Sequence, residues 1–566
     1  MGAKLTATLQ YFGDAYDGAT DPNDINGRRL AGSSFMKGFL GNASSETVQL
    51  IAGDDSDLDA VRRMIAGAAP EKTVRVVERY NLDKLGDQSV IQSPGPSVEA
   101  LAYQRLHFGQ TAFSLCGLTH TTSGFRLPDP FLNLRTTPVE PWDGLICTAE
   151  TVKTSLNYRF DAIDEYLRRR FGAPPPPRPQ MPVIPLGINT DEFQVTAADR
   201  ATLRAEIGAA DGDIVVSTLA RLSPHYKFDP FPIYLAMERA QRQTGRAMHL
   251  LFAGFFLGDY ADTVFRSGAA QLAPNVKVHF RKADTHDARR EALAGSDIFV
   301  FAIDSIQETF GLAPVEAMAA GLPVIASDWN GMKDTVTPDV GFRIPTRTVQ
   351  GRHSKTEALL NEVGFDKTVP YMTLTSGMAE MSVPDFAEKL ALLATDGDLR
   401  HSLGEAGKRR AAGVYDWSQV IPQYEAFWAE LDAIRRAAGR ADGARYKGMP
   451  SPVAPPVFDF FACYPTRQGF AADITFAAEA DAEERLKLVY QARNYSTVKR
   501  SPLNLQAAGE MLRLIAGWEG EAGPTYRDLA AASSHTEEIV EKTLIWLLKY
   551  DLIASREQAS TAKTAG

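Results

Sequence analysis

Apolar runs of strand length alternate with helical patterns along the first half of the chain. The strand-like runs are Leu5–Phe12, Val48–Ile51, Val74–Val77, Ala112–Leu118 and Leu145–Cys147. Leu58–Ala66 and Thr151–Phe171 instead place their apolar residues at helical spacing. This alternation predicts a parallel sheet covered by helices on both faces.

A proline run interrupts this alternation at Pro174–Pro177, followed by Pro179 and Pro182. Proline cannot continue a helix, and a run of prolines stiffens the chain. We therefore place a domain junction here, with a first Rossmann-like domain over residues 1–182 and a new strand at Val183–Pro185.

The strand and helix patterns then start again. We expect strands at Ile214–Ala220, His249–Ala253, Val276–Phe280, Ile298–Phe301 and Pro323–Ala326, with helices near 228–244, 259–272, 287–294 and 313–320. The predicted fold class is α/β, with a second Rossmann-like domain over residues 183–415. Ligands of such sheets bind outside the carboxyl ends of the strands, which predicts a site in the cleft between the two domains.

The last third of the chain changes character. Residues 345–382 show no clear period and are expected to form a long loop or insertion. An amphipathic pattern predicts a crossover helix over residues 416–438. The polar, Gly- and Pro-rich stretch 439–456 indicates a linker, and residues 457–566 a small, mostly helical, winged-helix-like domain.

Composition narrows the functional classes. The 566 residues are 44% hydrophobic and 23% charged, with a net charge of −10, which disfavours binding to nucleic acid. The sequence has three scattered cysteines, and it shows neither a signal-peptide pattern nor an apolar stretch long enough to span a membrane. These features favour a cytoplasmic protein. Gly2 and Thr6 match a myristoylation pattern, although residues 4–12 also suit a first strand, so a peripheral membrane contact stays open.

The segment Ser296–Trp329 is the richest in candidate chemistry. It predicts a strand, a loop and a short helix, with Pro314 at the first helical position and Gly321 after the end. The helix N-terminus would face the cleft, where its free N–H groups suit a diphosphate. Glu308 in the loop and Glu316 on the helix are either acceptors for sugar hydroxyls or acids that stabilise the helix dipole.

A basic pair follows an earlier strand of the same predicted sheet. Arg221 and Lys227 lie in the loop after Ile214–Ala220. They are either solvated surface cations or the charges that neutralise a leaving diphosphate. Because they and the two glutamates follow strands of one predicted sheet, a shared site is favoured.

Together these residues resemble the retaining glycosyltransferases of family 4, also called group 1, which have the GT-B fold. The combination is specific, although each piece alone would be weak. The resemblance covers about residues 4–437. The matching positions are Glu308 and Glu316 within QETFGLAPVEAMAAGLPVIAS, the pair Arg221 and Lys227, Val183–Phe193, and the turn Gly254–Gly258.

The resemblance implies roles in the second domain. Arg221 and Lys227 would bind the donor diphosphate and stabilise the leaving group. Glu308 would hold sugar hydroxyls near the reacting carbon, and Glu316 would hold the ribose. The further donor-binding positions implied are Phe310, Gly311 and Leu312 at the phosphates, Arg281 and Lys282 in the stretch that lines the base pocket, and Gly254.

In the first domain, His120 within SLCGLTHTTSG resembles the histidine that faces the donor sugar. The alternative is a histidine whose hydrogen bond caps a strand end. Gly27 and Leu30–Ser34 match a glycine-rich loop that lets the backbone approach donor or acceptor. Helix Trp417–Arg436 resembles the terminal helix that crosses back onto the first domain.

The reaction that the resemblance implies moves a hexosyl group from a nucleoside-diphosphate sugar to a hydroxyl group, with retention and without a metal or other cofactor. The acceptor would be a glycan, a lipid-linked molecule or a small molecule. The leaving diphosphate would help to deprotonate it. This chain departs from the family pattern at Ser327–Val336 and in residues 345–382 and 457–566.

Other interpretations stay open. An epimerase or hydrolase on this fold would need an acid/base pair in the cleft, for which only Glu308 and His120 are candidates. A non-catalytic sensor of sugar nucleotides would act through residues 457–566. Asp55 and Asp57 could hold a metal, but acids also suit the start of a helix.

For residues 457–566 we expect homodimerisation or the docking of a partner. Glu537, Glu538 and Glu541 lie on the helix that would otherwise enter a nucleic-acid groove, and they would repel phosphates.

Overall fold

The computed structural model describes residues 6–16, 27–52, 55–124, 128–446, 449–497 and 503–556. The chain divides into two compact units, Met1–Ser451 and Pro452–Gly566. Gly2, and with it the myristoylation pattern, lies outside the described residues. The domain boundaries predicted within the first unit stay predictions.

The first unit contains an N-terminal sheet of six parallel strands, in the order β3-β2-β1-β4-β5-β6. Its strands are β1 (Thr8–Gln10), β2 (Thr47–Ile51), β3 (Thr73–Val76), β4 (Val90–Gln92), β5 (Ser114–Thr119) and β6 (Gly144–Cys147). Leu115 and its neighbour Cys116 are both buried, in the cores on opposite faces of this sheet. Helices therefore cover both faces, as the apolar runs predict.

The helices of this domain are α1 (Gly13–Tyr16), α2 (Gly27–Asn42), α3 (Asp55–Ala68), α4 (Glu99–Arg105), α5 (Pro128–Thr136) and α6 (Glu150–Phe171). The glycine-rich loop expected at Gly27 and Leu30–Ser34 is wrong, because these residues form the first turns of α2. Phe35 and Phe39, one turn apart, bury one face of this helix, and that packing outweighs the low helix propensity of its glycines.

The second sheet of the first unit also has six parallel strands, in the order β12-β11-β10-β7-β8-β9. Its strands are β7 (Ile214–Leu222), β8 (Met248–Phe256), β9 (Lys277–Lys282), β10 (Ile298–Phe301), β11 (Val324–Ser327) and β12 (Gly341–Ile344). When the strands of each sheet are counted from its own first strand, both sheets have the order 3-2-1-4-5-6. This is the Rossmann order, so the predicted α/β class with two Rossmann-like domains is confirmed.

The second sheet is covered by α7 (Ala197–Glu206), α8 (Phe231–Thr244), α9 (Asp259–Leu272), α10 (His286–Ala294), α11 (Leu312–Ala319), α12 (Met332–Thr335), α15 (Val383–Thr395) and α16 (Gly397–Arg410). The strand expected at Val183–Pro185 is wrong, because only Val183 forms an isolated bridge there, to Cys147. The surrounding prolines lack the N–H groups that a longer ladder would require.

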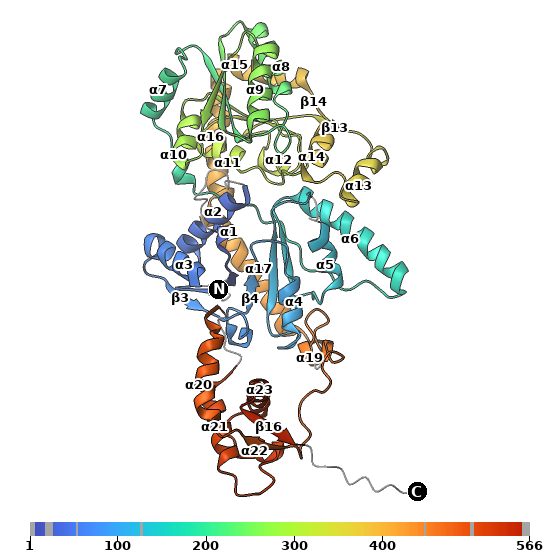
Figure 1. The fold of residues 1–566 in the computed structure, drawn as a ribbon. Coiled ribbons are helices and arrows are strands. Elements are labelled where there is room, and N and C mark those ends of the chain that lie inside the picture. Colours follow the sequence, from blue (N-terminus) through green and yellow to red (C-terminus); the bar gives the residue numbers. More distant parts are fainter. Residues whose placement is uncertain are drawn as a thin grey trace. The chain divides into compact units, whose positions relative to one another are not determined.

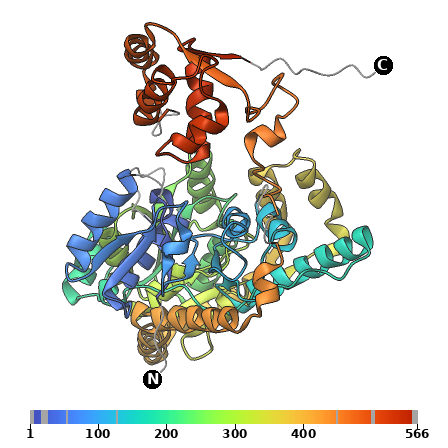
Figure 2. The same ribbon diagram turned by 90° about the horizontal axis from the view of Figure 1, so that it is seen from below.

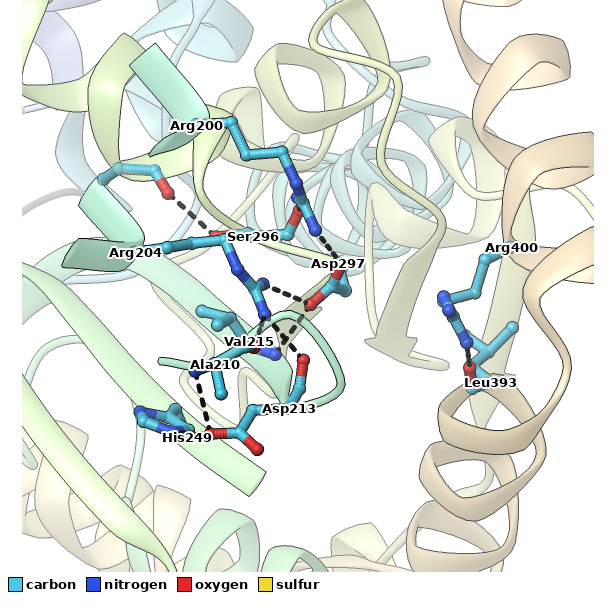
Figure 3. A network of polar contacts seen from close by, with 11 residues as sticks. Arg200, Arg204, Ala210, Asp213, Val215, His249, Ser296, Asp297, Leu393 and Arg400 are labelled. Atoms are coloured by element: carbon cyan, nitrogen blue, oxygen red, sulfur yellow. Dashed lines mark hydrogen bonds and ion pairs between the residues drawn. The ribbon is translucent and has the colours of Figure 1, made fainter. Parts of the chain in front are cut away.

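Helix α7 is fixed to the amino-terminal ends of β7 and β10 by a polar network (Figure 3). Arg200 bonds to Asp297 at 2.6 Å, and Arg204 reaches the other oxygen of Asp297 at 3.0 Å. Val215 N–H donates to the same carboxylate at 2.8 Å. This network lies at the ends of the strands away from those where a Rossmann sheet binds its ligand, so its role is structural.

Residues 345–382 form ordered secondary structure, so the prediction of a long loop is wrong. Strands β13 (Thr346–Thr348) and β14 (Ala379–Met381) pair antiparallel, and α13 (Lys355–Glu362) and α14 (Thr368–Ser376) lie between them. Few of these side chains are buried, so the sequence carries no helical period to detect. In Figures 1 and 2 alike, this yellow segment lies beside the turquoise helix α6.

Helix α17 (Trp417–Ala437) packs on the first sheet and on α2, as Figure 1 shows. Trp417 Nε1 donates to Ser34 Oγ at 2.8 Å, and Trp428 Nε1 donates to Gln92 Oε1 at 3.0 Å. The chain thus returns to its first domain after completing the second. The short helix α18 (Arg440–Ala444) follows.

The second unit contains α19 (Val457–Phe460), β15 (Thr475–Ala478), α20 (Ala482–Arg493), α21 (Leu505–Ala516), α22 (Tyr526–Ala532), α23 (Glu537–Lys549) and β16 (Ile553–Arg556). Strands β15 and β16 pair antiparallel, and a separate apolar core joins them to the helices. The predicted mostly helical unit is confirmed. Its role in dimerisation or docking stays a prediction. Within the described part of the chain, no helix combines the length and apolarity needed to cross a bilayer.

Candidate functional site

A cavity of about 450 Å³ lies at the carboxyl ends of β7, β8 and β10. Arg221, Gly254 and Phe301 line it from these three strand ends, and Leu30 and His120 line it from the first domain. Ligands of Rossmann sheets bind at this end of the strands, so the cavity is the candidate site.

The charged side chains that line this cavity include an ion pair between Lys227 and Glu308. Lys227 Nζ lies 2.6 Å from Glu308 Oε2, and Gly311 N–H donates to Glu308 Oε1 at 3.2 Å. Burial alone would raise the pKa of Glu308, but the attraction of Lys227, these hydrogen bonds and the more distant Arg221 outweigh it and hold that pKa below its usual value. Glu308 is therefore ionised at neutral pH.

Arg221 adds a further positive charge to the same wall. It lies within β7, one residue before the strand ends, rather than in the following loop as predicted. Burial lowers the pKa of Arg221, and Glu308 opposes that shift. Arg221 forms no ion pair within the described parts of the chain. Together with the Lys227–Glu308 pair, it leaves the cavity wall with an excess of positive charge.

The N-terminus of α11 opens onto the same cavity. Gly311 precedes the helix with φ +83°, a left-handed conformation that side chains rarely adopt, and Leu312 and Ala313 begin the helix at the cavity wall. The free N–H groups of a first helical turn bind anions. Pro314 is the third helical residue rather than the first, and Gly321 follows the end of the helix as predicted.

His120 lies at the junction of the two domains. Its Nε2 is 2.8 Å from Pro94 O, and its own carbonyl accepts a hydrogen bond from Thr309 Oγ1 at 2.6 Å. Thr121 Oγ1 donates to Gln307 O at 3.2 Å. These bonds bring His120 to the Glu308 loop. A sugar-facing role and a strand-capping role both fit, since His120 also follows directly after β5.

Glu316 is separated from the cavity by another side chain. Arg289, on α10, forms an ion pair with Glu316 and lines the cavity itself, whereas Glu316 does not. Glu316 also lies in the second turn of α11, outside the first turn where acids stabilise a helix dipole. A contact between Glu316 and a ribose therefore requires Arg289 to move.

Three other predicted residues do not line the cavity. Arg281 forms ion pairs with Glu291 and Glu206, and Lys282 pairs with Asp284 at 2.6 Å. The residues that follow, Ala283–Thr285, line the cavity. Gly27 starts α2, whose cavity residue is Leu30. Phe310, Gly311 and Leu312 line the cavity as the resemblance implies, but their roles stay predictions.

Among the lining residues that sequence reasoning did not single out are Arg289 and His286. His286 Nε2 lies 3.2 Å from Glu192, and burial lowers the pKa of His286. Both follow Thr285, whose hydroxyl caps α10. A helix cap after the third strand is a detectable signal, since it places the first turns of α10 at the ligand end of the sheet.

Asp55 and Asp57 lie in the first turn of α3, where acidic residues favour the start of a helix. Across the described ranges, no cluster of three or more His, Cys, Asp or Glu side chains is arranged to hold a metal ion. The side chains of Asp55 and Asp57 lie outside the described part of the chain, so the absence of a metal at this pair stays a prediction.

Two parallel sheets of Rossmann order, with a positively charged cavity at the strand ends of the second sheet, define an α/β protein with two Rossmann-like domains. Residues 199–366 match the model of the family "Glycosyl transferases group 1". This part of the chain, which contains Arg221, Lys227 and the Glu308 loop, is therefore similar to that family.

Relatives are similar over parts of their length. The D-inositol 3-phosphate glycosyltransferase of Nocardia farcinica is 30% identical over 162 residues, 28% of this chain and 35% of that protein. The GDP-mannose-dependent alpha-(1-6)-phosphatidylinositol monomannoside mannosyltransferase of Mycobacterium tuberculosis is 25% identical over 282 residues, 48% of this chain and 62% of that protein. The chain thus matches less than two thirds of each relative.

Among solved structures, Anabaena HepE in complex with UDP-glucose has a TM-score of 0.48 and 16% identity, covering 75% of this chain and 99% of that one.

Proposed function

We propose that this chain is a glycosyltransferase that moves a hexosyl group from a nucleoside-diphosphate sugar to an acceptor hydroxyl, with retention of configuration. The observation that carries this proposal is the wall built by Arg221, Lys227, Glu308 and the N-terminus of α11 around one cavity. The match of residues 199–366 to the model of that family supports it.

The charges of this wall suit a donor with a diphosphate. The N–H groups at Leu312 and Ala313 would bind phosphate oxygens, while Arg221 and Lys227 would neutralise the charge that grows as the leaving group departs. In the unliganded protein, Lys227 is paired with Glu308. A bound diphosphate would share Lys227 and free one Glu308 oxygen for a sugar hydroxyl.

In the proposed step, the bond between the anomeric carbon and the diphosphate oxygen breaks, and the acceptor oxygen bonds to that carbon on the same face. The acceptor proton moves to the departing diphosphate. No protein base is then required, and the protein contributes position and charge. We propose that no metal takes part, because Arg221, Lys227 and the helix N-terminus already supply the positive charge.

The donor base and sugar are the open part of this proposal. The base would lie against the backbone of Ala283–Thr285, at the end of β9. The name of the Mycobacterium tuberculosis relative describes that protein as GDP-mannose-dependent. A guanosine donor is therefore one arm of the test, beside uridine and adenosine donors.

Thermal unfolding with UDP-, GDP- and ADP-sugars tests donor binding. We expect one nucleoside class to raise the unfolding temperature, since a ligand that binds only the folded state stabilises it. Turnover of that donor, radiolabelled in its sugar, then separates the functions. Transfer to an added acceptor supports the proposal, and hydrolysis alone or isomerised sugar would contradict it.

Addition of EDTA tests the role of a metal. We expect the transfer rate to stay within about twofold of the untreated rate, because the cavity charges come from side chains and backbone. A loss of activity that Mg²⁺ or Mn²⁺ restores would overturn this part of the proposal and would leave the family assignment intact.

A further inference from the structure

A second cavity, of about 430 Å³, adjoins the first. Thr121 and Gln307 line the first cavity, and their chain neighbours Thr122 and Ile306 line the second. Ser123 Oγ donates to Ile306 O at 2.9 Å, so the two segments form a common wall. The second cavity therefore opens beside the Glu308 loop but outside the proposed donor site.

Part of the wall of this second cavity comes from segments where the chain departs from the family pattern. Trp329 and Asn330 come from the unusual stretch Ser327–Val336. Asn361 and Tyr371 come from α13 and α14, in the insertion that Figures 1 and 2 show beside α6. Residues from both departures from the family pattern thus line the same cavity, which indicates a binding property particular to this chain.

Asn330 ties this cavity to the proposed reaction site. Its φ of +42° is a left-handed conformation that is rare for residues other than glycine. Its Oδ1 accepts a hydrogen bond from Thr151 Oγ1 at 2.6 Å, and its Nδ2 donates to Glu308 O at 2.6 Å. One side chain thus links α6, the cavity wall and the Glu308 loop. Such strained residues cluster at binding sites.

The chemistry of the lining suits a polyhydroxylated ligand. The hydroxyls of Ser123, Thr151 and Ser155 and the amide of Asn361 offer hydrogen bonds, and the rings of Trp329 and Tyr371 offer apolar faces. Among the lining residues that the structure describes, none is Asp or Glu.

Arg159 is the one positively charged residue among the described residues that line this cavity. It projects from α6, is half-buried, and forms no hydrogen bond or ion pair with any residue that the structure describes. Burial lowers the pKa of Arg159, but a guanidinium remains charged at neutral pH. A half-buried guanidinium without a protein partner is suited to the planar oxygens of a phosphate or carboxylate.

We propose that the second cavity binds the acceptor, and that the acceptor is a sugar-like polyol with an anionic group held by Arg159. This inference rests on the proposed glycosyl transfer, since it assigns the acceptor side of the same reaction. The anionic end lies against α6, and the reacting hydroxyl extends past the common wall at Ser123 toward Glu308.

Titration calorimetry on the full chain tests the charge of the ligand. The probes are glucose 6-phosphate and glucuronate, with glucose as their neutral counterpart, added with and without the nucleoside diphosphate that binds best. We expect the wild-type protein to bind at least one anionic probe about tenfold or more tightly than glucose, even when the nucleotide fills the donor site. Weak binding of both anionic probes, no tighter than glucose, would overturn the inference.

Arg159→Gln and Arg170→Gln form a matched pair on α6. Arg170 is exposed and outside the cavity. Arg159→Gln should weaken the anionic probe about tenfold or more, since a charge-assisted hydrogen bond is lost. It should leave glucose and nucleotide binding within twofold, and Arg170→Gln should leave all three unchanged. Equal losses in both variants, or none in either, would overturn the role of Arg159.

Asn361→Ala tests the same cavity at a second position on its wall. It should weaken the anionic probe and glucose by similar, few-fold factors, because it removes a hydrogen bond to the polyol and no charge. Failure of the proposed function would look different, with no nucleotide binding and no donor turnover in the wild-type protein. The titrations without nucleotide would still report on the cavity in that case.

Discussion

The two sheets of the first unit share one strand order, but the loops at their ligand ends differ in chemistry. After the fourth strand of the first sheet, β4, the chain continues as Ser-Pro-Gly-Pro-Ser, residues 93–97. After β10, the corresponding strand of the second sheet, it continues as Ala-Ile-Asp-Ser-Ile-Gln-Glu, residues 302–308. The first loop carries no charge, and the second carries Asp304 and Glu308.

This difference extends to the first strand of each sheet. Arg221 is the next-to-last residue of β7 and Lys227 follows the strand, whereas β1 is followed by Tyr11, Phe12 and Gly13. The strand order therefore determines where a ligand binds, and the residues of the loops determine which chemical class of ligand binds there. The charged loops of the second sheet suit phosphates, while the first domain closes the cavity with hydroxyl and carbonyl groups near His120.

Removal of Lys227 is the strongest test of the charged side. Lys227→Ala should lower kcat by about 100-fold or more, because one charged donor to a leaving group contributes on this scale. The circular dichroism spectrum should stay unchanged. Lys277→Ala, an exposed lysine on β9 outside the cavity, is the control and should retain near wild-type turnover. Activity near the wild-type level in Lys227→Ala would show that the charges of the second sheet do not serve the reaction.

Asp304 provides a pH test of the same loop. Burial raises the pKa of Asp304 to about 7, from an ordinary value of 3.8. The folded protein therefore holds a proton that the unfolded chain loses above about pH 4. This contribution to stability is complete below the unfolded pKa and is lost as pH rises through the folded one. Asp304→Asn should remove that loss.

The measurement is thermal or urea unfolding of both proteins at pH 5 and at pH 8. Relative to wild type, Asp304→Asn should gain about 2–4 kcal/mol in free energy of unfolding between the two pH values. Ser93 follows β4 and carries no titratable group. Ser93→Ala should therefore change the free energy of unfolding, relative to wild type, by the same amount at pH 5 and at pH 8. A pH-independent effect of Asp304→Asn would mean that Asp304 is ionised in the folded protein.

The comparison also explains which parts of the site are predictable from sequence. Glu308, Arg221 and Lys227 are detectable because charges directly after apolar strands have few structural reasons to be there. The contact between Glu316 and Arg289 is not detectable, since the two lie on different helices and no spacing links them. Helix α2 is not detectable because its glycines resemble a loop, although Gly32 and Gly38 serve close packing.

Gly38 and Gly41 test that packing in the first domain. A Cβ atom at Gly38 would lie 2.1 Å from Trp417 Cγ, whereas one at Gly41 would meet no atom within 4 Å. Gly38→Ala should therefore destabilise the protein by about 1–3 kcal/mol, through displacement of α17. Gly41→Ala on the same helix should stabilise it by up to ~1 kcal/mol. Urea unfolding should show opposite shifts, and equal shifts would mean that α17 does not rest on α2.

The smallest expected effect concerns Lys282, which the resemblance places at the donor base. In the structure its amine pairs with Asp284 at 2.6 Å, and its side chain is 65% exposed. Such surface pairs contribute little, typically below 1 kcal/mol. Lys282→Ala should therefore change neither the donor KM nor the donor-induced rise in unfolding temperature by a measurable amount, about twofold in KM at most. A tenfold rise in KM would show that side chains at the end of β9 contact the donor, and that the charged surface of the second sheet is wider than the cavity wall around Lys227.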